Sequence, residues 1–161
     1  MGRKKILVYF LILALIGLAS VIVFNTLKSK HRRFYLENEY YNDKGLTDVS
    51  VKELEDMLEY EESFILFVYN DFCSFSVPCD SVFDEASKKL NMQILQIPYK
   101  EFKKSSLKRK IKYAPSVIIF NKGKIVKYLD AEKDEDKERY QNKFKFQNWV
   151  TDNVYQRKEK N

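Results

Sequence analysis

The chain has 161 residues, of which 45% are hydrophobic, 15% aromatic and 32% charged, and its formal net charge is +6. This length suits one ordinary domain, and the scarcity of glycine (4) and proline (3) excludes a collagen-like or linker-rich protein. All 23 acidic residues and 26 of the 29 basic ones follow the first 24 residues, so the rest of the chain is only mildly basic. That balance does not indicate nucleic-acid binding.

An apolar segment close to the N-terminus, ILVYFLILALIGLASVIVF at residues 6–24, contains no charged side chain. A helix of this length, rising about 1.5 Å per residue, nearly spans the hydrocarbon core of a bilayer. No small-x-small cleavage site and no lipid-accepting cysteine follow the segment. We therefore expect an uncleaved single-pass anchor in the cell membrane. The basic residues on its two sides are balanced, so the positive-inside rule gives little bias; a short basic N-tail favours an extracytoplasmic domain.

The remaining chain divides into a polar stretch and a folded domain. We expect, in order, a basic tail (1–5), the anchor (6–24), a juxtamembrane linker (25–44), the soluble domain (45–157) and a C-terminal tail (158–161). In the domain, LTDVS predicts a short strand, and Ser50 with Glu53 forms a capping box before a helix in VKELEDMLEY. SFILFVYND is a continuous apolar run that predicts a buried central strand.

The second half of the domain alternates in the same way. PCDSVFDEASKKLN predicts a helix whose apolar side consists of Val82, Phe83, Ala86 and Leu90. MQILQIPY predicts a strand, and KEFKKSSLKRKIKY predicts a basic, weakly amphipathic helix. PSVIIF and KIVKYL predict two strands joined by the hairpin signal NKG. DAEKDEDKER is expected as a loop or frayed helix start. FKFQNWVTDNVYQ predicts a closing helix with inward-facing Phe146, Trp149, Val150 and Val154.

This order of elements, β-α-β-α-β-α-β-β-α, defines the expected fold class. Alternating strands and helices imply parallel strands with helices on both faces, and the hairpin adds antiparallel strands. The sequence therefore predicts an α/β fold, a three-layer α/β/α sandwich with a mixed central sheet, preceded by one transmembrane helix.

Both cysteines lie in the stretch FVYNDFCSFSVPCDSVF, Cys73 at the end of an apolar run and Cys79 at the start of a predicted helix. A structural disulfide over so short a loop would stabilise the fold little, because the entropic benefit grows with loop length. Redox chemistry is therefore favoured, while a static disulfide and two unlinked thiols stay open. A metal site needs more ligands, and the single histidine, His31, lies beside the predicted anchor. A phosphatase-type C-x5-R loop would need arginine where Cys79 stands.

Three stretches in order, LFVYNDFC, VPCDSVF and APSVIIFNKGKIV, resemble the thioredoxin-like fold superfamily. They look like its strand leading to the first active-site cysteine, its active-site helix start, and its cis-proline, strand, glycine turn and strand. The resemblance covers Gly45 to Tyr155. It implies thiol–disulfide exchange by a redox-active disulfide without a cofactor or metal. Carried over by position, Cys73 is the attacking cysteine, Cys79 the resolving one and Pro115 the cis-proline.

The resemblance also suggests where a peptide substrate lies. Phe72 and Phe75 are candidate rim residues for such a peptide, the alternative being ordinary loop packing, and Ala114 precedes the cis-proline. The partners implied are protein or peptide thiol/disulfide substrates and a membrane or extracytoplasmic redox partner. The basic segment 103–112 is either a solvated face or a docking patch for an acidic partner or anionic lipid headgroups.

The chain departs from the family pattern at several positions. Its C-x5-C spacing is three residues longer than C-x-x-C, so SFS is either an inserted loop or part of a turn that puts Ser76 in the attacking position. Phe67 stands where many relatives hold a buried acid, and Ala114 replaces a common threonine.

Three functions remain in competition. The first is a membrane-anchored thiol–disulfide oxidoreductase (oxidase, isomerase or reductase) acting on extracytoplasmic proteins or peptides. The second is a thioredoxin-fold interaction module of a membrane assembly with a structural or vestigial cysteine pair. The third is a redox sensor whose disulfide alters partner binding.

Overall fold

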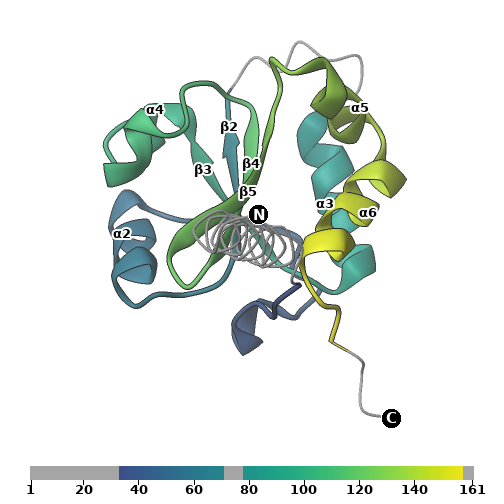
Figure 1. Ribbon diagram of the computed structural model, residues 1–161, viewed down its shortest axis with the longest axis horizontal. Helices are drawn as coiled ribbons and strands as arrows, with labels where there is room; N and C mark the ends of the chain where they lie inside the picture. Colours follow the sequence, from purple (N-terminus) through teal and green to yellow (C-terminus); the bar gives the residue numbers. More distant parts are fainter. Residues whose placement is uncertain (1–32, 71–77, 158–161) are drawn as a thin grey trace, which may run out of the picture. The chain divides into compact units, whose positions relative to one another are not determined.

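A five-stranded mixed sheet organises the part of the chain that the computed structural model describes, residues 33–70 and 78–157 (Figure 1). The strands lie in the order β1-β3-β2-β4-β5, with bounds Leu46–Asp48, Ile94–Pro98, Ile65–Tyr69, Ser116–Asn121 and Lys124–Asp130. Strands β1, β3 and β2 are parallel, whereas β4 is antiparallel to both β2 and β5. The expected mixed sheet is therefore confirmed.

Helices cover both faces of this sheet (Figure 1). One face carries α2 (Val51–Glu59) and the short α4 (Tyr99–Phe102). The other carries α3 (Cys79–Leu90), α5 (Asp134–Gln141) and α6 (Lys143–Asn153), which pack on one another. Two 3-10 helices, η1 (Asn38–Tyr40) and η2 (Ser106–Arg109), complete the elements. This arrangement is the predicted three-layer α/β/α sandwich, and its strand order and connections are those of a thioredoxin-like fold.

Two local signals in the sequence produce the expected geometry. The Ser50 side chain accepts a hydrogen bond from the Glu53 N–H at 3.2 Å, and the Glu53 carboxylate accepts the Ser50 N–H at 2.7 Å. This capping box starts α2 as predicted. Lys122 and Gly123 link β4 to β5 with φ of 50° and 68°. Two such residues form the tight hairpin turn whose twist matches the flanking strands.

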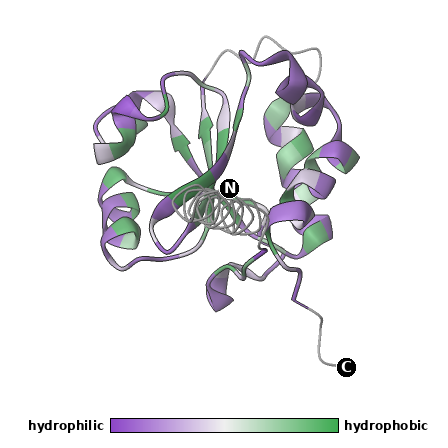
Figure 2. Ribbon diagram, viewed as in Figure 1, coloured by the Kyte–Doolittle hydropathy of each residue, from purple (hydrophilic) through white to green (hydrophobic). Residues whose placement is uncertain are grey.

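The core lies on both sides of the two central strands. Residues 64–68 and 116–120 are all buried, because helices cover both faces of β2 and β4. This explains why these strands read as continuous apolar runs instead of alternating patterns. Figure 2 shows hydrophobic central strands and helices that carry both hydrophobic and hydrophilic residues.

The predicted basic helix in KEFKKSSLKRKIKY is wrong in its length. Helix α4 ends at Phe102, and a separate 3-10 turn, η2, begins at Ser106. The buried Ser105 hydroxyl accepts the Leu107 N–H at 3.3 Å, and the Glu55 carboxylate accepts the Ser106 N–H at 2.6 Å. Such side-chain bonds satisfy the backbone outside a helix and so compete with helix continuation.

The residues from Arg33 onward, which include part of the stretch expected to be linker, belong to one compact unit. Leu36 and Tyr40 are buried in the core, and Phe34 forms a parallel bridge with Val154. Val154 therefore lies inward as expected, but just beyond the end of α6. Tyrosine and leucine side chains spaced through this polar stretch provide the apolar contacts that hold it in place.

The acidic stretch DAEKDEDKER is expected as a loop or frayed helix start, and most of it becomes α5. The expected anchor at 6–24 lies outside the described residues, as do the tail at 158–161 and residues 25–32 of the linker. Within 33–70 and 78–157, no helix is both long enough and apolar enough to cross a bilayer.

Candidate active site

One edge of the sheet collects the segments that the sequence analysis singled out. Val68 near the end of β2 pairs with Ser116 at the start of β4, and Ser116 pairs with Asp130 at the end of β5. Helix α3 crosses from β2 to the parallel strand β3, so it must begin at the carboxyl end of β2. The first turn of α3 and the Ala114–Pro115 loop therefore lie at the same edge (Figure 1).

Cys79 is the first residue of α3, and it is disulfide-bonded and only 1% exposed. Pro78 precedes it at the N-cap and provides no side-chain hydrogen bond. The unpaired N–H groups and the partial positive charge of a helix N-terminus favour a thiolate there. An incoming thiol cannot reach so buried a sulfur, so any thiol–disulfide exchange would have to take place on the sulfur bonded to Cys79.

Three of the predicted site residues fall outside the described ranges. They are the other cysteine and its aromatic neighbours, Cys73, Phe72 and Phe75. Ser76, the alternative attacking position, lies in the same gap. Their roles stay predictions.

Aromatic rings surround the α3 turn that carries Cys79. Phe83, one turn further along α3, is buried. The centre of its ring lies 4.9 Å from the centre of the Phe67 ring, which it meets edge-on. The ring centres of Tyr140 and Phe146 lie 5.5 Å and 4.4 Å away. Phe67 thus belongs to this cluster and provides a hydrocarbon ring instead of a group that could accept a proton.

The Ala114–Pro115 peptide bond is cis, as the resemblance implies, and polar contacts hold the loop around it. The Ser116 hydroxyl donates to the Tyr113 carbonyl at 2.8 Å. The buried Tyr140 hydroxyl, on α5, lies 3.0 Å from the Pro115 carbonyl and 2.8 Å from the Leu129 carbonyl. Tyr140 therefore joins the proline loop to β5.

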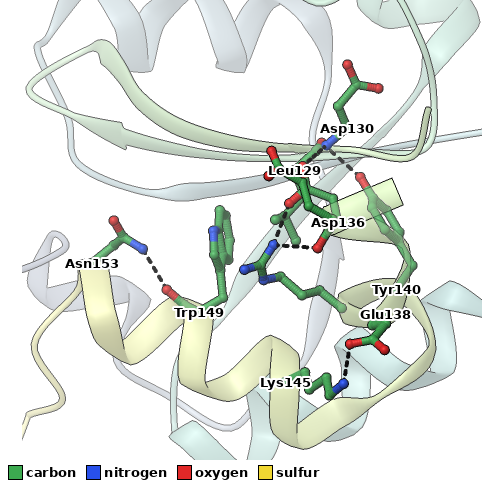
Figure 3. A network of polar contacts seen from close by, with 10 residues as sticks. Leu129, Asp130, Asp136, Glu138, Tyr140, Lys145, Trp149 and Asn153 are labelled. Atoms are coloured by element: carbon green, nitrogen blue, oxygen red, sulfur yellow. Dashed lines mark hydrogen bonds and ion pairs between the residues drawn. The ribbon is translucent and has the colours of Figure 1, made fainter. Parts of the chain in front are cut away.

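Charged groups connect helix α5 to the end of β5 through hydrogen bonds, as Figure 3 shows. The buried Asp136 carboxylate accepts the Asp130 N–H at 3.1 Å and an Arg139 N–H at 2.6 Å. Burial raises the pKa of Tyr140 well above its ordinary value, and the negative charges of Asp136 and Asp130 add to this shift. The phenol therefore stays protonated and able to donate.

Tyr140 is the site residue that sequence reasoning missed. It lies in DEDKERYQ, a stretch so rich in charge that no apolar period is visible. The signal available was a single large aromatic in an otherwise charged helix.

No family model matches the chain, and no curated protein matches its sequence. Among solved structures, the J-Trx1 fragment of ERdj5 is similar at 16% identity and a TM-score of 0.49, covering 68% of this chain. The chain spans 50% of that fragment. Thioredoxin from Trypanosoma brucei brucei is similar at 13% identity and a TM-score of 0.45, over 73% of this chain and 99% of that one.

Thioredoxin from Plasmodium falciparum is also similar, at 14% identity and a TM-score of 0.44 over 59% of this chain and 91% of that one. The fold assignment itself rests on the strand order and helix positions of this chain.

Proposed function

We propose that the protein is a membrane-anchored thiol–disulfide oxidoreductase that acts on protein or peptide substrates outside the cytoplasm. The observation that carries this proposal is the disulfide-bonded Cys79, buried at the first residue of α3 and at the same sheet edge as the Ala114–Pro115 loop. The chain contains two cysteines, so we take Cys73 as the partner of Cys79.

Oxidation of a substrate dithiol transfers two electrons from the substrate to the protein disulfide. In the oxidised protein, a substrate thiolate attacks the Cys73 sulfur and releases Cys79 as a thiolate, which leaves a mixed disulfide between Cys73 and the substrate. A second substrate thiolate then attacks the substrate sulfur of this bond and releases the Cys73 thiolate. The substrate has gained a disulfide, and the protein has become a dithiol. The reverse sequence reduces a substrate disulfide.

The burial of Cys79 decides the roles of the two sulfurs in this scheme. Attack on Cys79 would need an incoming sulfur inside the core, whereas attack on its partner does not. Cys79 therefore leaves during substrate oxidation and resolves the mixed disulfide during substrate reduction, and Cys73 is the sulfur that meets substrate. A turn that put Ser76 in place of Cys73 would remove this chemistry.

The anchor and the location belong to the same proposal. The uncharged segment 6–24 supports a single membrane span. Structural and catalytic disulfides persist in oxidising compartments, so a disulfide-bonded Cys79 supports a domain outside the cytoplasm.

One feature of the structure favours a binding module as the second candidate. Phe67 and Phe83 form an aromatic contact beneath the first turn of α3. Without a proton acceptor at that position, resolution by a Cys79 thiol is slow, so a mixed disulfide would persist as a covalent complex.

The reduction potential of the Cys73–Cys79 pair distinguishes an oxidoreductase from a protein with a structural disulfide. The full chain in a neutral detergent is equilibrated with glutathione buffers, and the dithiol fraction is read by thiol alkylation and mass shift. A potential between about −120 and −270 mV, the range of known thiol–disulfide oxidoreductases, is expected for the enzyme. A potential below about −300 mV would mark a structural bridge and contradict the proposal.

A further inference from the structure

A small pocket opens beside the Ala114–Pro115 loop. It has a volume of about 200 Å³ and is lined by Lys110, Ile111, Lys112, Tyr113, Ser116, Tyr128 and Asp130. These residues come from the segment before β4, the start of β4 and the end of β5, so the pocket lies at the edge that holds the candidate active site. Its volume is below that of a typical ligand cavity and suits one or two side chains.

The backbone that carries the pocket's lysines is fixed from both sides. Ile111 is buried in the core, so its neighbours Lys110 and Lys112 are turned out and exposed. The Tyr99 hydroxyl donates to the Lys112 carbonyl, and the Ser116 hydroxyl donates to the Tyr113 carbonyl. The backbone at this wall of the pocket is therefore already ordered, so only the lysine side chains lose freedom when a ligand binds.

The pocket lining carries a net positive charge, because its two lysines outnumber its one carboxylate. Among the described residues, neither Lys110 nor Lys112 forms an ion pair, whereas Lys104 on the preceding segment pairs with Glu101 at 2.7 Å. Lys108 and Arg109, just before the pocket, are also exposed.

In the described part of the chain, the acidic residue of the lining, Asp130, forms no ion pair with either lysine. The Asp130 carboxylate accepts the Glu132 N–H at 3.1 Å. The Lys133 ammonium lies 5.4 Å from the centre of the ring of Tyr128, which lines the pocket, and adds a positive charge nearby.

We propose that this pocket is a substrate subsite for acidic side chains, so that the protein prefers peptides with aspartate or glutamate near the exchanged cysteine. The proposal rests on the proposed function, because it places the acidic residue of the substrate beside the proline loop. The two ammonium groups attract a carboxylate, and the exposed Tyr113 offers a hydroxyl donor and a ring surface. Carboxylate side chains fit this pocket in size and charge, and a bulky anion does not.

The test compares two labelled peptides that lack cysteine and differ only in carrying two glutamates or two glutamines. Binding to the full chain in a neutral detergent is measured by fluorescence anisotropy at low salt. Two exposed ion pairs should together make the glutamate peptide bind about two- to thirtyfold tighter. This preference should fall strongly near 0.5 M salt, because exposed charges are screened.

The decisive variant is K110Q/K112Q, and its matched control is K122Q/K124Q, which removes the same charge at the β4–β5 turn, at the far end of these strands. We expect K110Q/K112Q to abolish the preference and the control to keep it. Equal affinities for the two peptides, or the same loss in both variants, would overturn the subsite. Displacement of the glutamate peptide by inorganic phosphate as readily as by glutarate would also overturn it, since the pocket would then be a general anion site.

A second arm separates this proposal from the proposed function. The same peptides, each with one cysteine in a disulfide, are used as substrates in exchange assays. Exchange at equal rates with both peptides would refute the subsite and leave the oxidoreductase intact. Absence of exchange with either peptide, with the anisotropy preference still abolished in K110Q/K112Q, would refute the oxidoreductase and leave the acidic-peptide site standing.

Discussion

Replacing Tyr140 by phenylalanine removes one hydroxyl and keeps the ring, so it isolates the polar contact at the proline loop. The hydroxyl lies within 3.0 Å of the Pro115 carbonyl and 2.8 Å of the Leu129 carbonyl. It has a single proton, so these two acceptors share one donor. The loss is therefore counted once, as a buried polar group left unsatisfied, at about 1–3 kcal/mol of unfolding free energy.

Urea unfolding of the oxidised protein measures this cost. The chain has one tryptophan, Trp149, which is buried and stacked on Phe146 with the two ring centres 5.9 Å apart. Its fluorescence therefore reports on the core. The matched control is Tyr60→Phe, because Tyr60 is 75% exposed and its change should stay within about 0.5 kcal/mol. A Tyr140→Phe variant as stable as this control would refute the inferred contact.

Tyr140→Phe also tests whether Tyr140 positions the loop for exchange. The pKa of Tyr140 is raised well above its ordinary value, so the phenol is protonated at neutral and mildly basic pH, and its effect on stability should not vary there. Under conditions where the variant is fully folded, we expect kcat/KM for a peptide disulfide to fall about three- to tenfold. A purely structural role would leave that ratio unchanged.

Substitutions at three further positions test the packing and the electrostatics. Phe67→Asp buries a carboxylate among aromatic rings, so it should lower the unfolding free energy by at least about 3 kcal/mol at neutral pH. The loss should be smaller at pH about 5, where the buried acid is neutral. Phe67→Leu keeps an apolar side chain and should lower the unfolding free energy by about 1 kcal/mol. The hydrogen bond from Lys88 lowers the pKa of Asp84, and the hydrogen bond from the Leu46 N–H lowers it further. Ionised Asp84 therefore stabilises the fold above about pH 4, and this stabilisation is lost as pH falls through the lower native pKa. Asp84→Asn should remove this pH dependence, and urea midpoints of the two proteins should converge at low pH. Ser50→Ala breaks the α2 capping box and should cost about 1 kcal/mol by the same unfolding assay.

The order of strands and helices could be predicted from the sequence because it depends on local periodicity and caps. Residues 64–68 form an apolar run of strand length, and Ser50 starts α2 through a neighbour three positions away. The break between α4 and η2 could not be predicted in this way. It depends on a hydrogen bond from Ser106 to Glu55, which lies 51 positions away along the chain.

The same distinction between local motifs and long-range contacts applies to the candidate site. Cys79 and Pro115 were predicted from motifs that resemble a known family, and the cis Ala114–Pro115 bond agrees with that prediction. Tyr140 was not predicted, because it contacts carbonyl groups 25 and 11 positions away. No local pattern encodes those contacts. The roles of Cys73, Phe72 and Phe75 stay predictions.

Trapping of a mixed disulfide tests the central claim most directly. The full-length Cys79→Ser variant, in a neutral detergent, is incubated with a peptide disulfide and analysed by non-reducing electrophoresis and mass spectrometry. We predict a covalent adduct through Cys73 that dithiothreitol releases and that Cys73→Ser and the double variant do not form. An adduct that forms equally in Cys73→Ser, or no adduct with Cys79→Ser, would contradict the assignment of a redox-active Cys73–Cys79 pair.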